Sequence, residues 1–147
     1  MNLSERLNDD MKQAMKSKDK FRLTVIRMIR ASVKNLEIDL KRSLDDNEVL
    51  DILSREVKQR KDSLQEFKNA GRDDLVTDLA AEIEIISQYL PEQLTEEEIQ
   101  EIVRQTIQEL GASSKADMGK VMSALLPKTK GRADGKLVNQ FVQQFLQ

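Results

Sequence analysis

Cysteine and histidine are both absent from this chain of 147 residues. Their absence excludes disulfides, thiol nucleophiles, zinc sites built from cysteine or histidine, histidine general bases and Ser-His-Asp triads. Aromatic residues make up only 3% of the chain, with no tryptophan and one tyrosine, Tyr89. The sequence therefore offers no aromatic platform on which nucleic-acid bases would stack, so any RNA recognition would have to use backbone and shape.

Proline and glycine are scarce, at two and five residues, and they interrupt regular structure at few positions. No uncharged apolar run approaches the ~20 residues that a membrane-spanning helix needs. The first residues also lack the basic start and apolar stretch of a signal peptide. From these absences we expect a soluble cytoplasmic protein without a membrane partner.

Charge is abundant, at 34% of residues, but it is unevenly distributed around a net charge of −2. Residues 112–147 hold six cations and two acids, whereas residues 95–111 hold one cation and five acids. A basic end on an acidic protein predicts a confined anion-binding surface and argues against general adhesion to nucleic acid, and no DNA partner is expected.

Apolar residues recur at steps of three and four through most of the chain, which is typical of amphipathic helices. We therefore predict an all-α protein. The second predicted helix runs from Asp19 to about Arg42, and the third carries an apolar face from Leu50 to Phe67 that Arg60 interrupts. These two long helices are expected to form an antiparallel hairpin, closed by the first and fourth helices.

The segment from Pro91 to Leu94 is the predicted domain boundary. Pro91 is expected to stop the fourth helix, and Thr95 and Glu98 have the spacing of a capping box that starts a new one. We thus predict a helical hairpin domain over residues 1–94 and a small three-helix tail module over residues 95–147. Further tail helices are expected over residues 118–126 and from residue 135 to about 146.

A basic turn over residues 127–139 departs from the helical pattern. Pro127 is expected to end the helix before it, and Asp134 is placed to cap the helix after it. Cations, backbone N–H groups and the positive end of a helix together favour phosphate. On composition alone, a solvated surface loop is the simpler interpretation. The cations of the turn are Lys128, Lys130, Arg132 and Lys136.

A second set of cations lies on the second predicted helix, where Arg27, Arg30, Lys34 and Lys41 follow at steps of three, four and seven. Such a stripe is able to follow a nucleic-acid backbone. A solvated helix face, balanced by carboxylates of a neighbour, is again the simpler interpretation.

Paired aspartates are expected where helices start or break, where carboxylates serve as caps and favour the helix dipole. The pairs are Asp9/Asp10, Asp45/Asp46 and Asp73/Asp74. No nucleophile, nucleotide-binding loop or ligand cluster accompanies them. We therefore expect no catalytic residue, no metal site and no cofactor.

Several runs resemble a known family. Residues 118–122 and 131–139 resemble the tail module of the B subunit of the tRNA-dependent amidotransferase. Residues 60–63, 70–72 and 89–94 resemble the free-standing YqeY proteins that carry this tail. The resemblance covers essentially the whole chain, and its specificity comes from the runs taken together.

The resemblance implies a tRNA-binding accessory protein that contacts the tRNA elbow, around the D-loop, through a basic tail surface. Two glycines would permit close approach of the RNA. The implied surface comprises Gly119, Lys120, Lys128, Lys130, Gly131, Arg132 and Lys136, and the stripe of Arg27, Arg30 and Lys34 completes the candidate RNA-binding set.

The family link also brings an association with carbon–nitrogen ligase activity that uses glutamine as nitrogen donor. The cradle that binds ATP and magnesium in that enzyme is missing from this sequence, so at most an accessory part is expected. The alternative hypothesis is a protein–protein adaptor whose hairpin docks on an amidotransferase or another translation protein.

Overall fold

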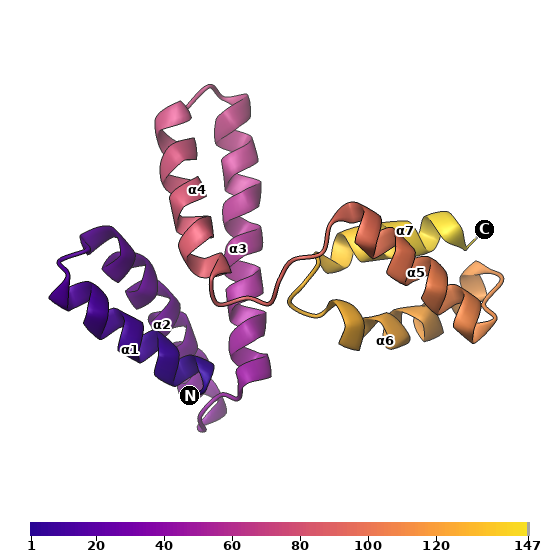
Figure 1. The fold of residues 1–147 in the computed structure, drawn as a ribbon, viewed down its shortest axis with the longest axis horizontal. Coiled ribbons are helices and arrows are strands. Elements are labelled where there is room, and N and C mark those ends of the chain that lie inside the picture. Colours follow the sequence, from indigo (N-terminus) through magenta and orange to yellow (C-terminus); the bar gives the residue numbers. More distant parts are fainter. Residues whose placement is uncertain (147) are drawn as a thin grey trace. The chain divides into compact units, whose positions relative to one another are not determined.

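The structure, a computed structural model, describes residues 1–146 and is helical without strands over that range (Figure 1). This confirms the predicted all-α class. The chain divides into two compact units between Leu90 and Pro91, and each unit is described by itself. Within the described residues, no helix is both long enough and apolar enough to cross a membrane.

The N-terminal unit consists of two helix pairs. In the first pair the chain reverses at Lys18, and in the second at Gly71, which both have a positive φ. The helices are α1 (Leu3–Lys16), α2 (Lys20–Leu40), α3 (Asp46–Asn69) and α4 (Asp73–Ser87).

The pairing within this unit differs from the expected hairpin of the second and third helices. The most extensive packing is of α3 against α4 and of α1 against α2, and Figure 1 shows each pair side by side. Helix α3 contributes Val49, Leu53 and Val57 to the core that it shares with α2. The apolar spacing had marked the buried face of each helix correctly, but spacing does not specify which neighbour covers that face.

The core of the unit lies where the two pairs meet. Ile26 and Ile29 of α2, Leu53 of α3 and Ile86 of α4 are fully buried there. Burying side chains of this size contributes about 1.5–3 kcal/mol each relative to exposure. This core therefore holds the two helix pairs together.

Tyr89, just after α4, fastens the end of that helix to α1. Its hydroxyl donates a hydrogen bond to Asp10 Oδ2, and the guanidinium of Arg6 lies 4.6 Å from the centre of its ring. Burial, followed by the hydrogen bond to Asp10, raises the pKa of the tyrosine hydroxyl above its ordinary value. Asp9 and Asp10 thus lie inside α1 and not at a helix start or break as expected, and Asp10 is a structural hydrogen-bond acceptor.

The start of α3 is fixed by a capping box in which Asp45 and Glu48 each accept a hydrogen bond from the other's backbone N–H. Arg42 also donates to both carboxylate oxygens of Glu48, at 2.7 and 2.8 Å. The hydrogen bonds from Arg42, and then the one from the Asp45 backbone, lower the pKa of Glu48 from 4.5 to about 2.

We therefore expect an NMR titration of the Glu48 carboxylate to have a midpoint near 2, and Arg42→Ala to raise it. Because the folded-state pKa is depressed, the stabilisation from this group is fully present above pH 4.5 and is lost as pH falls through about 2. A midpoint near 4.5 in the unmodified protein would show that the pair does not persist in solution.

The C-terminal unit packs three α-helices around a second core. Thr95 and Glu98 form the predicted capping box, and Gly111 ends the helix with a φ of +64°. The helices are α5 (Glu96–Leu110), α6 (Met118–Thr129) and α7 (Gly135–Phe145), with the 3-10 turn η1 (Lys115–Asp117) before α6. Residues fully or nearly fully buried in this core include Ile99, Val103, Val121, Leu125, Val142 and Leu146.

Candidate nucleic-acid interface

The basic turn begins later than the sequence predicts. Pro127 lies inside α6, which continues to Thr129, so the expectation that Pro127 ends the helix is wrong. A proline removes one backbone donor, and here the carbonyl that loses its partner belongs to Ser123. Both residues lie on the exposed side of α6, where solvent reaches that carbonyl.

Gly131 adopts the left-handed backbone conformation on which the turn depends. Its φ is +74°, a region that L side chains rarely adopt, and an added Cβ would lie 3.5 Å from Cδ of Pro91. After it, Asp134 caps α7 by accepting a hydrogen bond from the Lys136 backbone at 3.0 Å, as the sequence predicts. The glycine is therefore required by the turn itself.

The turn is held by the segment Pro91–Leu94, which belongs to the same unit. The Leu94 backbone N–H donates to the Arg132 carbonyl at 2.9 Å, and Gln93 Nε2 donates to the Gly131 carbonyl at 2.7 Å. In return, Arg132 Nε donates to the Glu92 carbonyl at 3.3 Å. We call this set of contacts the clamp.

Sequence analysis missed the clamp because it treated residues 91–94 as a connection between domains. The contacts join residues about forty positions apart in the chain, beyond the reach of any local pattern. The only sequence signal was that both segments belong to the runs that carry the family resemblance.

One exposed face of α6 gathers several of the predicted residues. Steps of four and three along α6 place Gly119, Ser123 and Leu126 on one side of the helix. The C-cap residue, Lys130, follows four residues later, and Lys120 borders this side. All five are exposed, and Leu126 retains 61% of its accessible surface. We call these five residues the α6 outer face.

Nothing in the described part of the chain requires a glycine at position 119. Its φ is not positive, and a Cβ placed on it would meet nothing within 4 Å. Glycine within a helix costs roughly 0.5–1 kcal/mol relative to alanine. Its lack of a side chain leaves the α6 outer face flat at this point.

Lys128 does not belong to this face. Its Nζ donates to the buried Thr106 Oγ1 at 3.0 Å and lies 3.6 Å from a carboxylate oxygen of Glu109, both on α5. The structure thus separates Lys128 from Lys120 and Lys130, although all three were assigned to one surface. Lys136, in the first turn of α7, is exposed.

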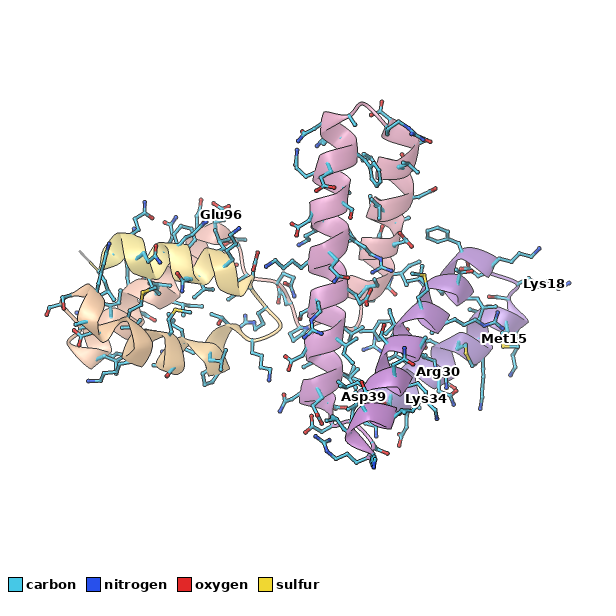
Figure 2. The ribbon with its side chains drawn as sticks, turned by 180° about the vertical axis from the view of Figure 1, so that it is seen from behind. Met15, Lys18, Arg30, Lys34, Asp39 and Glu96 are labelled. Carbon is cyan, nitrogen blue, oxygen red and sulfur yellow. The ribbon has the colours of Figure 1, made fainter. Side chains whose placement is uncertain are left out.

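The basic stripe of α2 is also divided. Arg27 and Lys34 are exposed, but Arg30 is half-buried, and its Nη1 lies 2.9 Å from Sδ of Met11 on α1. Arg30 and Lys34 are labelled in Figure 2. Lys41 is exposed but lies just beyond α2, as its C-cap residue. Arg30 is therefore the member of the predicted stripe that does not face solvent fully.

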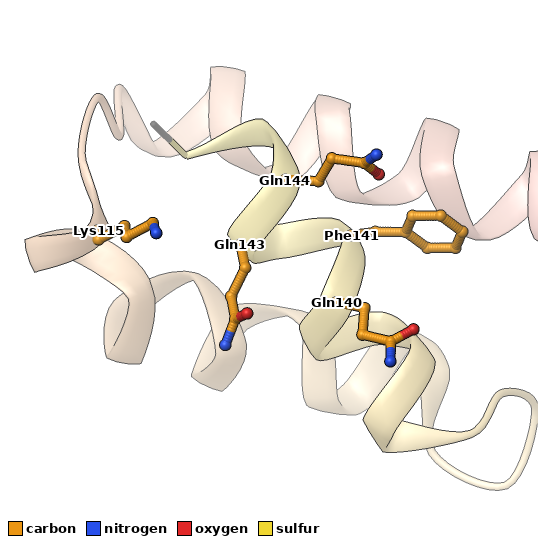
Figure 3. A pocket seen from close by; sticks show the side chains of 5 residues that line it. All are labelled: Lys115, Gln140, Phe141, Gln143 and Gln144. Atoms are coloured by element: carbon orange, nitrogen blue, oxygen red, sulfur yellow. The ribbon is translucent and has the colours of Figure 1, made fainter.

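A shallow, open depression of about 520 Å³ lies on α7. It is lined by Lys115 of η1 and by Gln140, Phe141, Gln143 and Gln144 of α7, which are labelled in Figure 3. Its lining includes none of the residues predicted for RNA binding. Among the residues that the structure describes, no three acidic side chains converge as a metal site would require.

Comparison with known proteins matches the chain to one family along most of its length. The profile described as "Yqey-like protein" matches residues 4–146. "Altered inheritance of mitochondria protein 41, mitochondrial" of Pyrenophora tritici-repentis is 34% identical over 142 residues, which cover 95% of this chain and 78% of the relative.

The protein of the same name from Saccharomyces cerevisiae is 35% identical over 133 residues, covering 90% of this chain and 63% of the yeast protein. That of Lachancea thermotolerans is 45% identical over 85 residues, covering 57% of this chain and 46% of the relative. The chain thus matches less than two thirds of the length of these two relatives.

These names contradict the expected cytoplasmic location, because the relatives are named as mitochondrial proteins. That expectation rested on the absence of a signal-like start, which is weak support for a location.

Proposed function

The chain belongs to the family of YqeY-like proteins, and on that premise we propose that it is an RNA-binding accessory protein whose ligand is folded tRNA. The proposed contact is the tRNA elbow, as the resemblance to the amidotransferase tail implies. The proposed surface is the α6 outer face with the neighbouring cations Arg132 and Lys136. The proposed role is to bind and position tRNA, with no catalytic step assigned to this chain.

The observation that carries the proposal is a helix face that is flat at Gly119, with cations around it. Gly119 leaves room for an RNA backbone to approach, while Lys120 and Lys130 supply charge near it. Phosphate contacts of this kind provide affinity without base reading. The scarcity of aromatic residues fits such a mode, since base stacking would need them.

The clamp supports the proposal by fixing the geometry of the turn. Three hydrogen bonds from Pro91–Leu94 and Arg132 hold the backbone of residues 131–132 in place. A preordered turn loses less conformational entropy when a ligand binds. Arg132 supports this geometry through its Nε and is therefore a poor choice for a test of charge alone.

We expect the triple variant Lys120→Ala, Lys130→Ala, Lys136→Ala to bind folded tRNA about 10- to 100-fold more weakly near physiological salt. The slope of log affinity against log salt should become shallower by roughly two to three, because up to three phosphate contacts are lost. Both are measured by titrating labelled total tRNA with the full chain at several salt concentrations, beside a random single-stranded RNA of equal length.

The matched control removes three exposed cations of the N-terminal unit, as Lys12→Ala, Lys16→Ala, Lys61→Ala, and changes the net charge equally. A second control, Gly119→Gln, keeps every cation but fills the flat face, and should also weaken binding. Equal losses in the two triple variants, or no preference for folded tRNA in the unmodified protein, would refute the proposal.

A further inference from the structure

Helix α2 carries a second regular stripe, on the face that does not pack against the rest of its unit. Six uncharged residues follow at alternating steps of three and four, the spacing of core positions in a coiled coil. All six are exposed. We call them the outer seam, and they are Phe21, Thr24, Met28, Ala31, Asn35 and Ile38.

The outer seam leaves large apolar side chains in solvent. Phe21 retains 42% of its accessible surface, Met28 47% and Ile38 63%. Single exposed apolar residues are ordinary, but these three lie on one helix face at intervals of seven and ten. Their arrangement matches a helix that pairs with another helix.

A row of cations borders this seam on one side. Lys20, Arg27 and Lys34 recur every seven residues, at the position that flanks the core of a coiled coil. None of the three forms an ion pair or hydrogen bond through its side chain with any residue in the described part of the chain. We call them the basic edge, and Figure 2 shows one of them, Lys34, on α2.

The other side of the seam is largely closed by the protein itself. Val25 is buried in the core, and Ser32 Oγ lies 3.4 Å from Oε1 of Glu56 on α3. Among the α2 residues that flank the seam on that side, only Asp39, also labelled in Figure 2, is charged, and Glu56 of α3 lies beside Ser32. A helix that docks on the outer seam would therefore have the cations of the basic edge along its solvent-exposed side.

Charge argues against a second copy of this chain as the partner. In an antiparallel pair the basic edges of both copies would face each other, and like charges there are destabilising. In a parallel pair, Lys20 would face Val25 and Lys34 would meet Asp39. Arg27 would face Ser32, and the carboxylate of Glu56 beside Ser32 is already paired with Arg60. RNA would meet the cations, but its backbone would gain little from covering Phe21, Met28 and Ile38.

We propose that the outer seam of α2 docks an acidic amphipathic helix of a different protein. The apolar positions of that helix cover Met28 and Ile38, its carboxylates meet the basic edge, and Asn35 favours one register. The seam also contains threonine and alanine, so the interaction is weak and reversible, with a Kd of about 10–100 µM. This inference rests on α2 alone and is independent of the proposed RNA surface.

The test uses a synthetic three-heptad peptide with leucine at its core positions, one core asparagine and glutamate at every flanking position. Its repelling glutamates limit self-association. Binding to the full chain is measured by fluorescence anisotropy against a peptide in which lysine replaces each glutamate. We expect saturable binding of the glutamate peptide and at least about tenfold weaker binding of the lysine peptide.

Two variants locate the contact. Met28→Glu with Ile38→Glu should abolish binding, and both sites are exposed, so the fold is kept. Arg27→Glu with Lys34→Glu should weaken binding of the glutamate peptide about tenfold and strengthen binding of the lysine peptide. Misfolding would not produce such a reversal of preference. The matched control, Arg55→Glu with Lys61→Glu on α3, should change neither affinity by more than about twofold.

Three results would overturn the proposal. The first is an equal affinity for both peptides, or no saturation below about 1 mM. The second is an α2 charge reversal that abolishes tRNA binding and leaves peptide binding unchanged. The third is sedimentation of the full chain as a dimer that Met28→Glu with Ile38→Glu disperses, which would identify a second copy as the occupant.

Discussion

Leu125→Ala is expected to unfold the C-terminal unit and leave the N-terminal unit folded. Leu125 on α6 is completely buried in the core that α5, α6 and α7 share. Truncating a buried leucine costs about 2–5 kcal/mol, because apolar transfer energy is lost and a cavity remains. A three-helix unit of this size has only about 3–5 kcal/mol of stability from its core. The cost of this one substitution is as large as that stability, so the unit is expected to unfold.

The two units are distinguished spectroscopically. Tyr89 is the only tyrosine, tryptophan is absent, and Tyr89 lies in the N-terminal unit, so tyrosine fluorescence reports that unit alone. Circular dichroism should lose roughly a third of its helical signal, the share held by α5, α6 and α7, while the tyrosine transition in denaturant stays in place.

The adjacent Leu126 provides the control, since it has similar chemistry but is 61% exposed. Leu126→Ala should change stability by no more than about 0.5 kcal/mol. Loss of the tyrosine transition together with the tail helices in Leu125→Ala would show that the units unfold as one.

Arg60→Ala is expected to destabilise the N-terminal unit by about 2–4 kcal/mol. Arg60 on α3 is only 7% exposed, and its Nη1 lies 2.5 Å from Oε2 of Glu56. Its Nε lies 3.9 Å from Glu82 on α4 and has no hydrogen-bond partner within the described residues. Removing the guanidinium leaves two partly buried carboxylates without their shared cation.

The same physics predicts recovery when the whole cluster is made apolar. In Arg60→Met, Glu56→Met, Glu82→Met, no charge remains to be desolvated, so stability should return to within about 1 kcal/mol of the original or exceed it. Tyrosine fluorescence in urea measures both variants, and exposed Arg55→Ala on α3 is the control. A loss of less than about 1 kcal/mol in Arg60→Ala would show that solvent already screens the cluster.

The helix class and many helix ends were predictable because their causes are local. Thr95 and Glu98 form their capping box, Asp134 caps α7, and Gly111 takes the left-handed conformation that ends α5. Pro127 was the exception, because whether a proline ends a helix depends on the surroundings of the carbonyl that loses its partner.

The candidate site was predictable only as a set of residue types. The sequence identified the cations and glycines, but it grouped Lys128 with Lys120 and Lys130, whereas Lys128 turns toward Thr106 on α5. The RNA-binding role of the remaining cations stays a prediction. The clamp was not predicted because Gln93 and Gly131 are distant in sequence, and local patterns do not show such contacts.

Sequence alone determined that this protein is helical, that it lacks cysteine and histidine chemistry, and that its C-terminal part is basic, since composition, periodicity and capping act within a few residues. Tertiary structure decided which helices pair and which carboxylates lie next to Arg60. It also decided that the outer seam of α2 is not covered by the rest of the unit. Periodicity shows that a helix has an apolar face, but only packing shows whether anything covers it.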